Sequence, residues 1–148
     1  SKRQQIINAI VARMQGILTA NGYETNLGTS VFDRETNLVD DDDLPALSVC
    51  DLVETHQLWN DQPDSVQQKN VLPVQLRIFV KSGTRAVELR KMFADVNKAI
   101  QTDLRWSELA MWTIPVKTGM IIPETDFVIG GGAIEIEVSY LTTTFDSY

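Results

Sequence analysis

The clearest hydrophobic pattern in this chain lies in residues 71–81, where every second side chain is aliphatic. The aliphatic positions are Leu72, Val74, Leu76, Ile78 and Val80. Five such side chains at a period of two predict a β-strand that buries one of its faces.

Residues 85–101 change to helical spacing. Apolar side chains recur there at three- and four-residue steps, at Ala86, Leu89, Phe93, Val96 and Ile100. This spacing predicts an amphipathic helix, with Thr84 as its N-cap after the turn formed by Ser82 and Gly83. A half-buried strand followed by such a helix can form a two-layer core, so we expect residues 71–101 to be the folding centre.

The rest of the chain adds one helix and several strands. Residues 4–21 have a second apolar stripe, and Asn21-Gly22 is expected to end that helix because both residues tolerate the left-handed conformation. Short strands are expected at residues 29–32, 46–54, 110–116, 119–122 and 133–144. Apolar residues on both faces of 46–54 predict a central strand, and Gly130-Gly131-Gly132 predicts a flexible hairpin turn.

Strands that follow one another without an intervening helix are expected to pair antiparallel. The sequence therefore predicts a single α+β domain over residues 1–148, with two amphipathic helices packed on one face of a mostly antiparallel sheet. Residues 55–70 are polar and read as a long loop, which we interpret as a contact arm. Residues 141–148 are expected to form a C-terminal arm.

Composition supports an ordinary globular protein. No apolar run approaches the roughly 20 residues that span a bilayer, so we expect no membrane association and synthesis in a reducing cytoplasm. The only cysteine, Cys50, lies in an apolar run and is interpreted as a buried side chain.

Charge is distributed unevenly along the chain. The net charge of −7 argues against general nucleic-acid binding. Residues 24–64 hold eleven acidic side chains against Arg34 alone, whereas residues 65–105 hold eight basic side chains against three acidic ones. Such segregation suggests opposed surfaces that can steer one copy of the chain onto another, although a chance distribution gives the same pattern.

No pattern of residues predicts catalysis. His56, the only histidine, has no triad signature around it, and a solvated or hydrogen-bonded role is favoured. The run Asp40 to Asp43 lacks the alternating ligands, central glycine and terminal glutamate of a calcium loop, so a solvated acidic loop is expected. We therefore predict no catalytic residues, no metal site and no cofactor.

Tryptophan is the residue type most suited to anchor an interface, and the chain has three: Trp59, Trp106 and Trp112. Trp112 fits an alternating strand and is predicted to be a core residue. Trp59 lies in the polar segment 55–70 and is the better candidate for contact.

Three stretches carry a resemblance to a known family. They are Arg3-Gln4-Gln5-Ile6-Ile7-Asn8-Ala9-Ile10, Asp43-Leu44-Pro45-Ala46-Leu47-Ser48-Val49 and Ile136-Glu137-Val138-Ser139-Tyr140-Leu141-Thr142-Thr143. With the order of elements, they resemble the tail-terminator, or tail-completion, proteins of long-tailed bacteriophages.

The resemblance implies a structural virion protein at the tail-neck junction, assembled in the host cytoplasm. In that family small α+β subunits form a ring, commonly of six, on the head-proximal end of the tail tube. The ring stops tube growth and provides the surface that joins the head connector. The implied partners are therefore further copies of the chain, the tail tube protein and the neck proteins, with DNA passing through the lumen without specific binding. Alternatives are another neck component, such as a head-closure or adaptor protein, or a small-molecule binding domain.

Two hypotheses about surfaces follow. The expected subunit or tube contacts are Trp59, Arg77, Lys81, Arg85, Lys91, Leu141, Thr143, Phe145 and Tyr148. The acidic loop Asp40, Asp41, Asp42 and Asp43 is expected either to line the lumen, where it would repel DNA phosphates, or to face basic residues of a neighbour.

Overall fold

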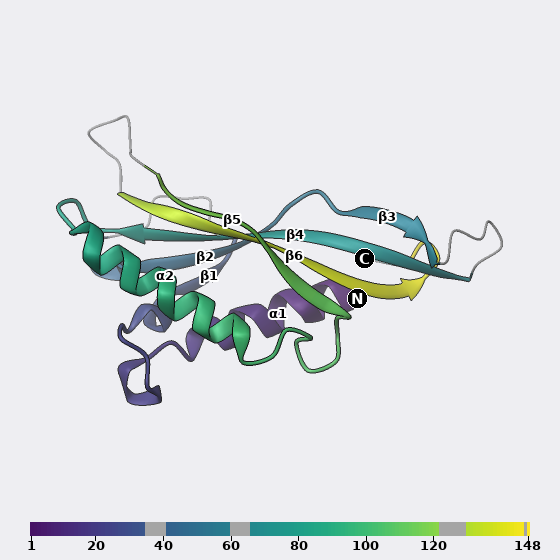
Figure 1. Cartoon of the computed structure of the whole chain (residues 1–148), viewed down its shortest axis with the longest axis horizontal. Helices are drawn as coiled ribbons and strands as arrows, with labels where there is room; N and C mark the ends of the chain where they lie inside the picture. Colours follow the sequence, from purple (N-terminus) through teal and green to yellow (C-terminus); the bar gives the residue numbers. More distant parts are fainter. Residues whose placement is uncertain (35–40, 60–65, 122–129, 147) are drawn as a thin grey trace.

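The computed structural model describes residues 1–34, 41–59, 66–121, 130–146 and 148. Two helices lie on one side of a six-stranded, mostly antiparallel sheet (Figure 1), which confirms the predicted α+β class. The helices are α1 (Lys2–Gln15) and α2 (Ala86–Gln101). The strands are β1 (Val31–Asp33), β2 (Ala46–Asp51), β3 (Thr55–Leu58), β4 (Gln67–Val80), β5 (Trp112–Ile121) and β6 (Gly130–Thr143).

The sheet is organised around β4 and β6. Its order is β1-β2-β4-β6-β5, and β3 pairs with β4 beside β2. β4 pairs with β6 along the full 14 residues of both strands, from Gln67↔Thr143 to Val80↔Gly130. Among the described pairs, only β1 and β2 run parallel.

The predicted inward faces of the two long strands are confirmed. The even-numbered aliphatic side chains from Leu72 to Val80 are all buried, and so are Ile134, Ile136, Val138 and Tyr140 of β6. They pack against the apolar stripes of both helices in one core cluster. The prediction that β2 is a central strand is also confirmed, because β2 lies between β1 and β4 with Ala46 to Cys50 buried. β2 ends at Asp51, and Val53 beyond it is 83% exposed, so the predicted strand over residues 46–54 is too long at its C-terminal end.

Both helices differ from the prediction at one end. Arg85 is the N-cap residue of α2, and the Thr84 hydroxyl instead donates to the Lys81 carbonyl oxygen and closes the preceding turn. The expected cap at Thr84 is therefore wrong. α1 ends at Gln15 and not at Asn21, because Gly16, a poor helix former, lets the chain bend. A separate 3-10 turn then ends at Gly22, which has the left-handed conformation expected there.

Residues 130–132 are part of a strand, so the expected flexible turn is wrong there. Gly130 to Gly132 pair with β4 at Val80, Phe79 and Ile78. A Cβ atom on Gly132 would collide with the Phe93 ring and the Gly119 carbonyl oxygen. Glycine is therefore needed here for close packing of β6 against α2 and β5.

A membrane-spanning helix is absent from the described ranges, since neither α1 nor α2 combines the length and apolar character that crossing requires.

Candidate functional site

The most distinctive surface feature is a β-arm that extends beyond the two helices. It consists of β3, the start of β4 at Gln67 and the end of β6 at Thr143, and it forms the right-hand end of the molecule in Figure 1. The prediction that residues 55–70 form a loop is therefore wrong at both of its ends, where β3 and β4 pair; residues 60–65 lie outside the described residues.

The sequence of β4 explains why residues 55–70 were predicted to be a loop. The inward-facing side chains change from aliphatic at Leu72 to polar at Asn70 and Gln68, where the helices no longer cover the sheet. Asn70 and Gln68 are nevertheless 0% and 6% exposed, respectively. Buried amides need hydrogen-bond partners, and those partners hold the arm together.

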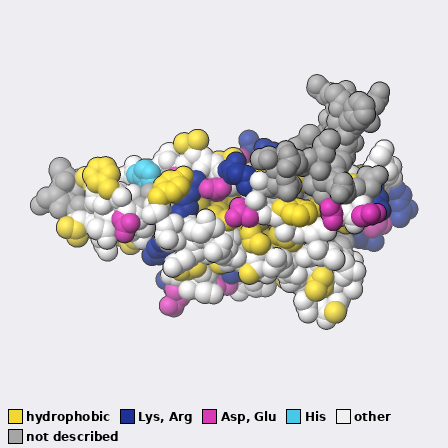
Figure 2. Space-filling model, turned by 180° about the vertical axis from the view of Figure 1, so that it is seen from behind, with side chains coloured by type: hydrophobic (Ala, Val, Ile, Leu, Met, Phe, Trp, Pro, Cys, Tyr) yellow, Lys and Arg dark blue, Asp and Glu magenta, His cyan; other side chains and the backbone are white. Residues whose placement is uncertain are grey.

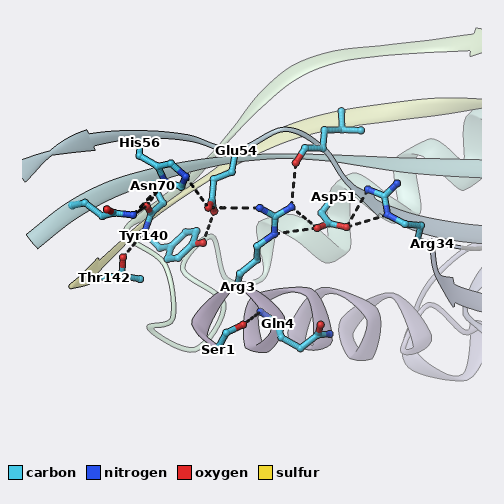
Figure 3. Close-up of polar contacts among 12 residues, drawn as sticks. Ser1, Arg3, Gln4, Arg34, Asp51, Glu54, His56, Asn70, Tyr140 and Thr142 are labelled. Carbon is cyan, nitrogen blue, oxygen red and sulfur yellow. Dashed lines mark hydrogen bonds and ion pairs between the residues drawn. The ribbon is translucent and has the colours of Figure 1, made fainter. Parts of the chain in front are cut away.

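The buried amides belong to a ladder of side-chain hydrogen bonds across the three strands. Gln68 Nε2 donates to Asn70 Oδ1 at 2.6 Å, and Asn70 Nδ2 donates to Thr142 Oγ1 at 2.9 Å. His56 Nδ1 lies 2.6 Å from Asn70 Oδ1. Figure 3 shows His56, Asn70 and Thr142 meeting on this face of the arm, so the ladder joins β3, β4 and β6.

A second polar cluster lies at the base of the arm. Tyr140 donates its hydroxyl hydrogen bond to Glu54 Oε1, and Arg3 Nη1 lies 3.6 Å from Glu54 Oε2. His56 Nε2 lies 3.7 Å from the same Glu54 oxygen. The Glu54 side chain is only 2% exposed. Figure 3 shows Arg3, His56 and Tyr140 around its carboxylate. The carboxylate is therefore enclosed by groups from α1, β3 and β6.

Arg3 extends this cluster to β2. Its Nη2 atom donates to Asp51 Oδ2 at 2.6 Å and to the Leu52 carbonyl oxygen at 3.2 Å. Arg34 Nη2 lies 3.1 Å from the other oxygen of Asp51. Burial alone would raise the pKa of Asp51, but the hydrogen bonds and charges of Arg3 and Arg34 outweigh it and lower that pKa.

Tyr140 stays protonated in this environment. Burial raises the pKa of Tyr140, and the hydrogen bond to Glu54 raises it further, because a phenolate beside a carboxylate would be disfavoured. The hydroxyl is thus a permanent donor. Tyr140 and Arg3 both lie against Glu54, and this arrangement stabilises the base of the arm.

The sequence contained one signal for this cluster that we did not use. Arg3 lies three and four residues before Ile6 and Ile7, on the buried face of α1. A charged residue in an apolar stripe needs a buried partner, and here that partner is Asp51. Among the described residues, no group of three or more His, Cys, Asp or Glu side chains could hold a metal ion.

The tip of the arm presents apolar side chains to solvent. Val66 and Phe145 are 74% and 97% exposed, and the Thr144 amide donates to the Val66 carbonyl oxygen. Figure 2 shows hydrophobic side chains at the surface on both sides of the single histidine, at the arm end of the molecule. Trp59 is half-buried and directly follows Leu58, the last residue of β3.

The remaining C-terminal candidates contact α1. The Leu141 carbonyl oxygen accepts a hydrogen bond from Lys2 Nζ at 3.0 Å, and the Tyr148 ring lies 4.5 Å from the Arg3 guanidinium carbon. Thr143 is exposed at the end of β6. The structure therefore places Thr143 and Phe145 at the end of the arm, and Leu141 and Tyr148 against the start of α1.

The predicted basic residues do not form one surface. Arg85 and Lys91 lie on the exposed side of α2, where both contact Glu88. Arg77 lies on the opposite face of the sheet, because its side chain alternates with the buried ones of β4, and it donates to Gln75. Lys81 is exposed at the end of β4.

The other two tryptophans, Trp106 and Trp112, lie in different environments. Trp106 is fully buried; its Nε1 atom donates to Thr113 Oγ1 at 2.8 Å, and Arg13 lies 3.7 Å from its ring centroid. Trp112 is 39% exposed, so its predicted core position is wrong. The apolar alternation of β5 faces outward because Thr113 takes the inward position opposite Val138.

β5 is one strand, whereas two strands were predicted at residues 110–116 and 119–122. Its register shifts between Pro115 and Lys117.

A groove of about 230 Å³ lies between α2 and the helix-facing side of β5 and β6. The apolar part of its lining comes from Ile100, Leu104, Ile114, Pro115, Ile134 and Ile136.

The acidic loop is only partly described. Asp40 lies outside the described residues, and Asp41, Asp42 and Asp43 form a 3-10 turn before β2. Asp42 is exposed and Asp43 half-buried. The lumen and neighbour hypotheses for this loop both remain predictions.

A scan against protein-family models and a search of curated proteins found no match to this chain.

Proposed function

We propose that this protein is a structural component of a long-tailed phage virion, which forms a ring on the head-proximal end of the tail tube. In this role the ring ends tube polymerisation and provides the surface for head joining. The observation that carries the proposal is the β-arm, which extends beyond the core, is held by buried polar side chains and exposes apolar groups at its tip.

The resemblance to tail terminators supports the same role. The stretch from Arg3 lies in α1, the stretch from Asp43 enters β2, and the stretch from Ile136 runs through β6 into the arm. The first and third stretches meet at the base of the arm, where Arg3 and Tyr140 both lie against Glu54. Residues that carry the resemblance thus also build the projecting element.

The arrangement favours assembly over catalysis. Glu54 is enclosed and has no open approach for a substrate, since its side chain is 2% exposed. The groove beside β5, at about 230 Å³, is smaller than the roughly 300–1,000 Å³ of typical ligand pockets. A small-molecule binding role is therefore less well supported than a contact between proteins, and no catalytic step is proposed.

The partners of the proposed ring are further copies of this chain, the tail tube protein and the neck proteins. The resemblance implies a ring of six. A head-closure or adaptor role would use the same arm at a neighbouring level of the neck.

Electron microscopy of tails assembled with and without the protein tests the proposal. Without the protein, tubes should grow to uncontrolled lengths; with it, they should end at a uniform length and carry a ring at the head-proximal end. Tubes of uniform length without the protein would contradict termination. Heads that fail to join tails of normal length would instead indicate the head-closure or adaptor role.

The acidic loop can be tested in the same assay. Replacing Asp40 to Asp43 with asparagine should leave rings intact and impair infectivity if the loop lines a DNA-conducting lumen. If the loop instead faces a neighbour, the same variant should remove the salt dependence of assembly. Unchanged infectivity and unchanged salt dependence would contradict both hypotheses.

A further inference from the structure

Phe145 is the most exposed large apolar side chain of the arm, and its backbone is held in an unusual conformation. The side chain is 97% exposed and φ is 66°, in the left-handed region. A bulky residue adopts that conformation only where its surroundings impose it. Such an outlier on a projecting element suggests that the position of the ring matters.

The buried ladder of the arm imposes this conformation. The Phe145 amide donates to Gln68 Oε1 at 2.8 Å, and Gln68 is itself fixed by its hydrogen bond to Asn70. On either side, the amides of Thr144 and Asp146 donate to the carbonyl oxygens of Val66 and Thr143. The chain is therefore fixed before and after the ring, and the ring itself points into solvent.

The groove between α2 and β5 has the size and lining for such a ring. Its volume is about 230 Å³, and an engineered apolar cavity of roughly 150 Å³ is enough to bind benzene. Ile134 and Ile136 contribute to its floor on β6, and Ile100 contributes from α2. An aromatic side chain inserted there would exchange water for aliphatic contacts.

Phe145 cannot fill the groove of its own chain. Thr143, at the start of the turn that carries Phe145, lies seven positions after Ile136, which lines the groove. At the rise of a β-strand this separation is about 23 Å. A ring that enters the groove must therefore come from another molecule.

Charges beside the two surfaces are complementary. Asp146 is exposed next to Phe145, whereas Arg105 is exposed next to Leu104 of the groove. Lys117 does not belong to this flank, because it lies 4.0 Å from Glu135, on the face of the sheet opposite to Ile134 and Ile136. The acidic Asp146 beside the Phe145 side chain and the basic Arg105 beside the groove favour approach in this orientation.

We propose that Phe145 of one copy inserts into the groove between α2 and β5 of a second copy. This inference rests on the proposed function and deepens it, because it names the two surfaces that join neighbouring subunits. The Phe145 side chain and the groove lie at different places on the chain, so the contact is head-to-tail. Repetition of this contact can close a ring of subunits.

Complementary variants test this contact by sedimentation velocity on the full chain. Phe145→Ala removes the ring, and Thr118→Trp fills the groove from an exposed position outside the core. Each variant alone should self-associate at least 10-fold more weakly than the wild type. A mixture of the two should form heterodimers and nothing larger, because only one intact ring-groove pair remains.

Controls separate this contact from general effects. Val53→Ala truncates another exposed apolar side chain, and Thr118→Ser leaves the groove open; both should associate like the wild type. Circular dichroism should show that every variant folds.

Outcomes that contradict the inference differ from those that contradict the proposed function. If Phe145→Ala and Thr118→Trp both associate and control tube length like the wild type, the ring-groove contact is wrong and the terminator role stands. If a mixture of the two variants forms no heterodimer, the contact is also wrong. If wild-type protein fails to control tube length while the ring-groove association is observed, the inferred contact stands and the proposed function fails.

Discussion

Tyr140 and Glu54 form a hydrogen bond that ties β6 to the link between β2 and β3. The two residues are 86 positions apart in the chain. The carboxylate is enclosed, and its second oxygen has Arg3 and His56 nearby but no hydrogen-bond partner among the described groups. The Tyr140 hydroxyl is therefore the main donor that compensates the burial of Glu54.

Tyr140→Phe should destabilise the protein by about 2 kcal/mol, because a hydrogen bond to a buried charged group is lost and no water replaces it easily. Urea unfolding at neutral pH measures this change. Tyr148→Phe is the matched control, since the Tyr148 side chain is 79% exposed, and it should change stability by less than about 0.5 kcal/mol. Equal stability of both variants would contradict the structural role of the Tyr140–Glu54 pair.

Asp51 predicts a loss of stability in acid. The pKa of Asp51 is lowered in the folded protein, since the contacts with Arg3 and Arg34 outweigh burial. A lowered carboxyl pKa contributes stability above the unfolded value of about 3.9, and this contribution is lost as the pH falls through the folded pKa. The decrease should therefore occur below about pH 4.

Asp51→Asn should show a smaller loss of stability between pH 7 and pH 3 than the wild type, because it lacks the carboxylate that is protonated in this window. Urea unfolding at the two pH values measures the difference. Asp42→Asn, which changes an exposed carboxylate, is the control and should keep the pH dependence of the wild type. If Asp51→Asn also kept the pH dependence of the wild type, the Arg3–Asp51 pair would not be the source of that dependence.

The arm depends on Gln68, whose side chain accepts a hydrogen bond from the Phe145 amide. Gln68→Ala should raise the hydrogen-exchange rate of that amide about 10-fold or more, because the bond that protects it is lost. Exchange measured by NMR reports this residue directly. Gln57→Ala, on the exposed β3, should leave the rate unchanged. If the exchange rate is unaltered in Gln68→Ala, the backbone hydrogen bonds of Thr144 and Asp146 alone would protect the Phe145 amide.

Periodicity predicted the body of the fold well. The alternation in β4 and the stripe of α2 identified side chains that are buried, because in both elements burial on one face is what selects apolar residues. The strands of the arm were not predicted in this way. Gln68 and Asn70 occupy inward positions of the same strand but are satisfied by hydrogen bonds, so no hydrophobic period marks them.

The candidate site was predicted in part. Leu141, Thr143, Phe145 and Tyr148 were expected to contact a neighbouring subunit or the tube, and that stays a prediction; the structure shows Leu141 and Tyr148 against Lys2 and Arg3 of α1. The groove could not be foreseen, because it depends on the distance between α2 and β5, which sequence spacing does not determine. The stripe of α1 indicated which way Arg3 faces, yet its partner Asp51 is 48 residues away and only the fold brings them together.

Trp106 and Trp112 also show that periodicity alone does not determine which side chains are buried. Trp106 lies in a turn without periodicity and is fully buried, whereas Trp112 fits an alternating strand and is 39% exposed. The difference arises because Thr113 faces inward, where its hydroxyl accepts from Trp106 Nε1 and donates to the Leu104 carbonyl oxygen. A buried turn thus fixes the orientation of β5.

Trp106→Phe should therefore destabilise the protein by about 2–4 kcal/mol, since it leaves a cavity and removes both the hydrogen bond to Thr113 and the contact with Arg13. Trp112→Phe, at the partly exposed position, should cost less than about 1 kcal/mol. Urea unfolding monitored by circular dichroism compares the two without relying on tryptophan emission. The fluorescence spectrum gives an independent check, because loss of the buried Trp106 should shift the remaining emission to the red. If Trp112→Phe were the more destabilising change, the inward position of Thr113 and the orientation of β5 would both be wrong.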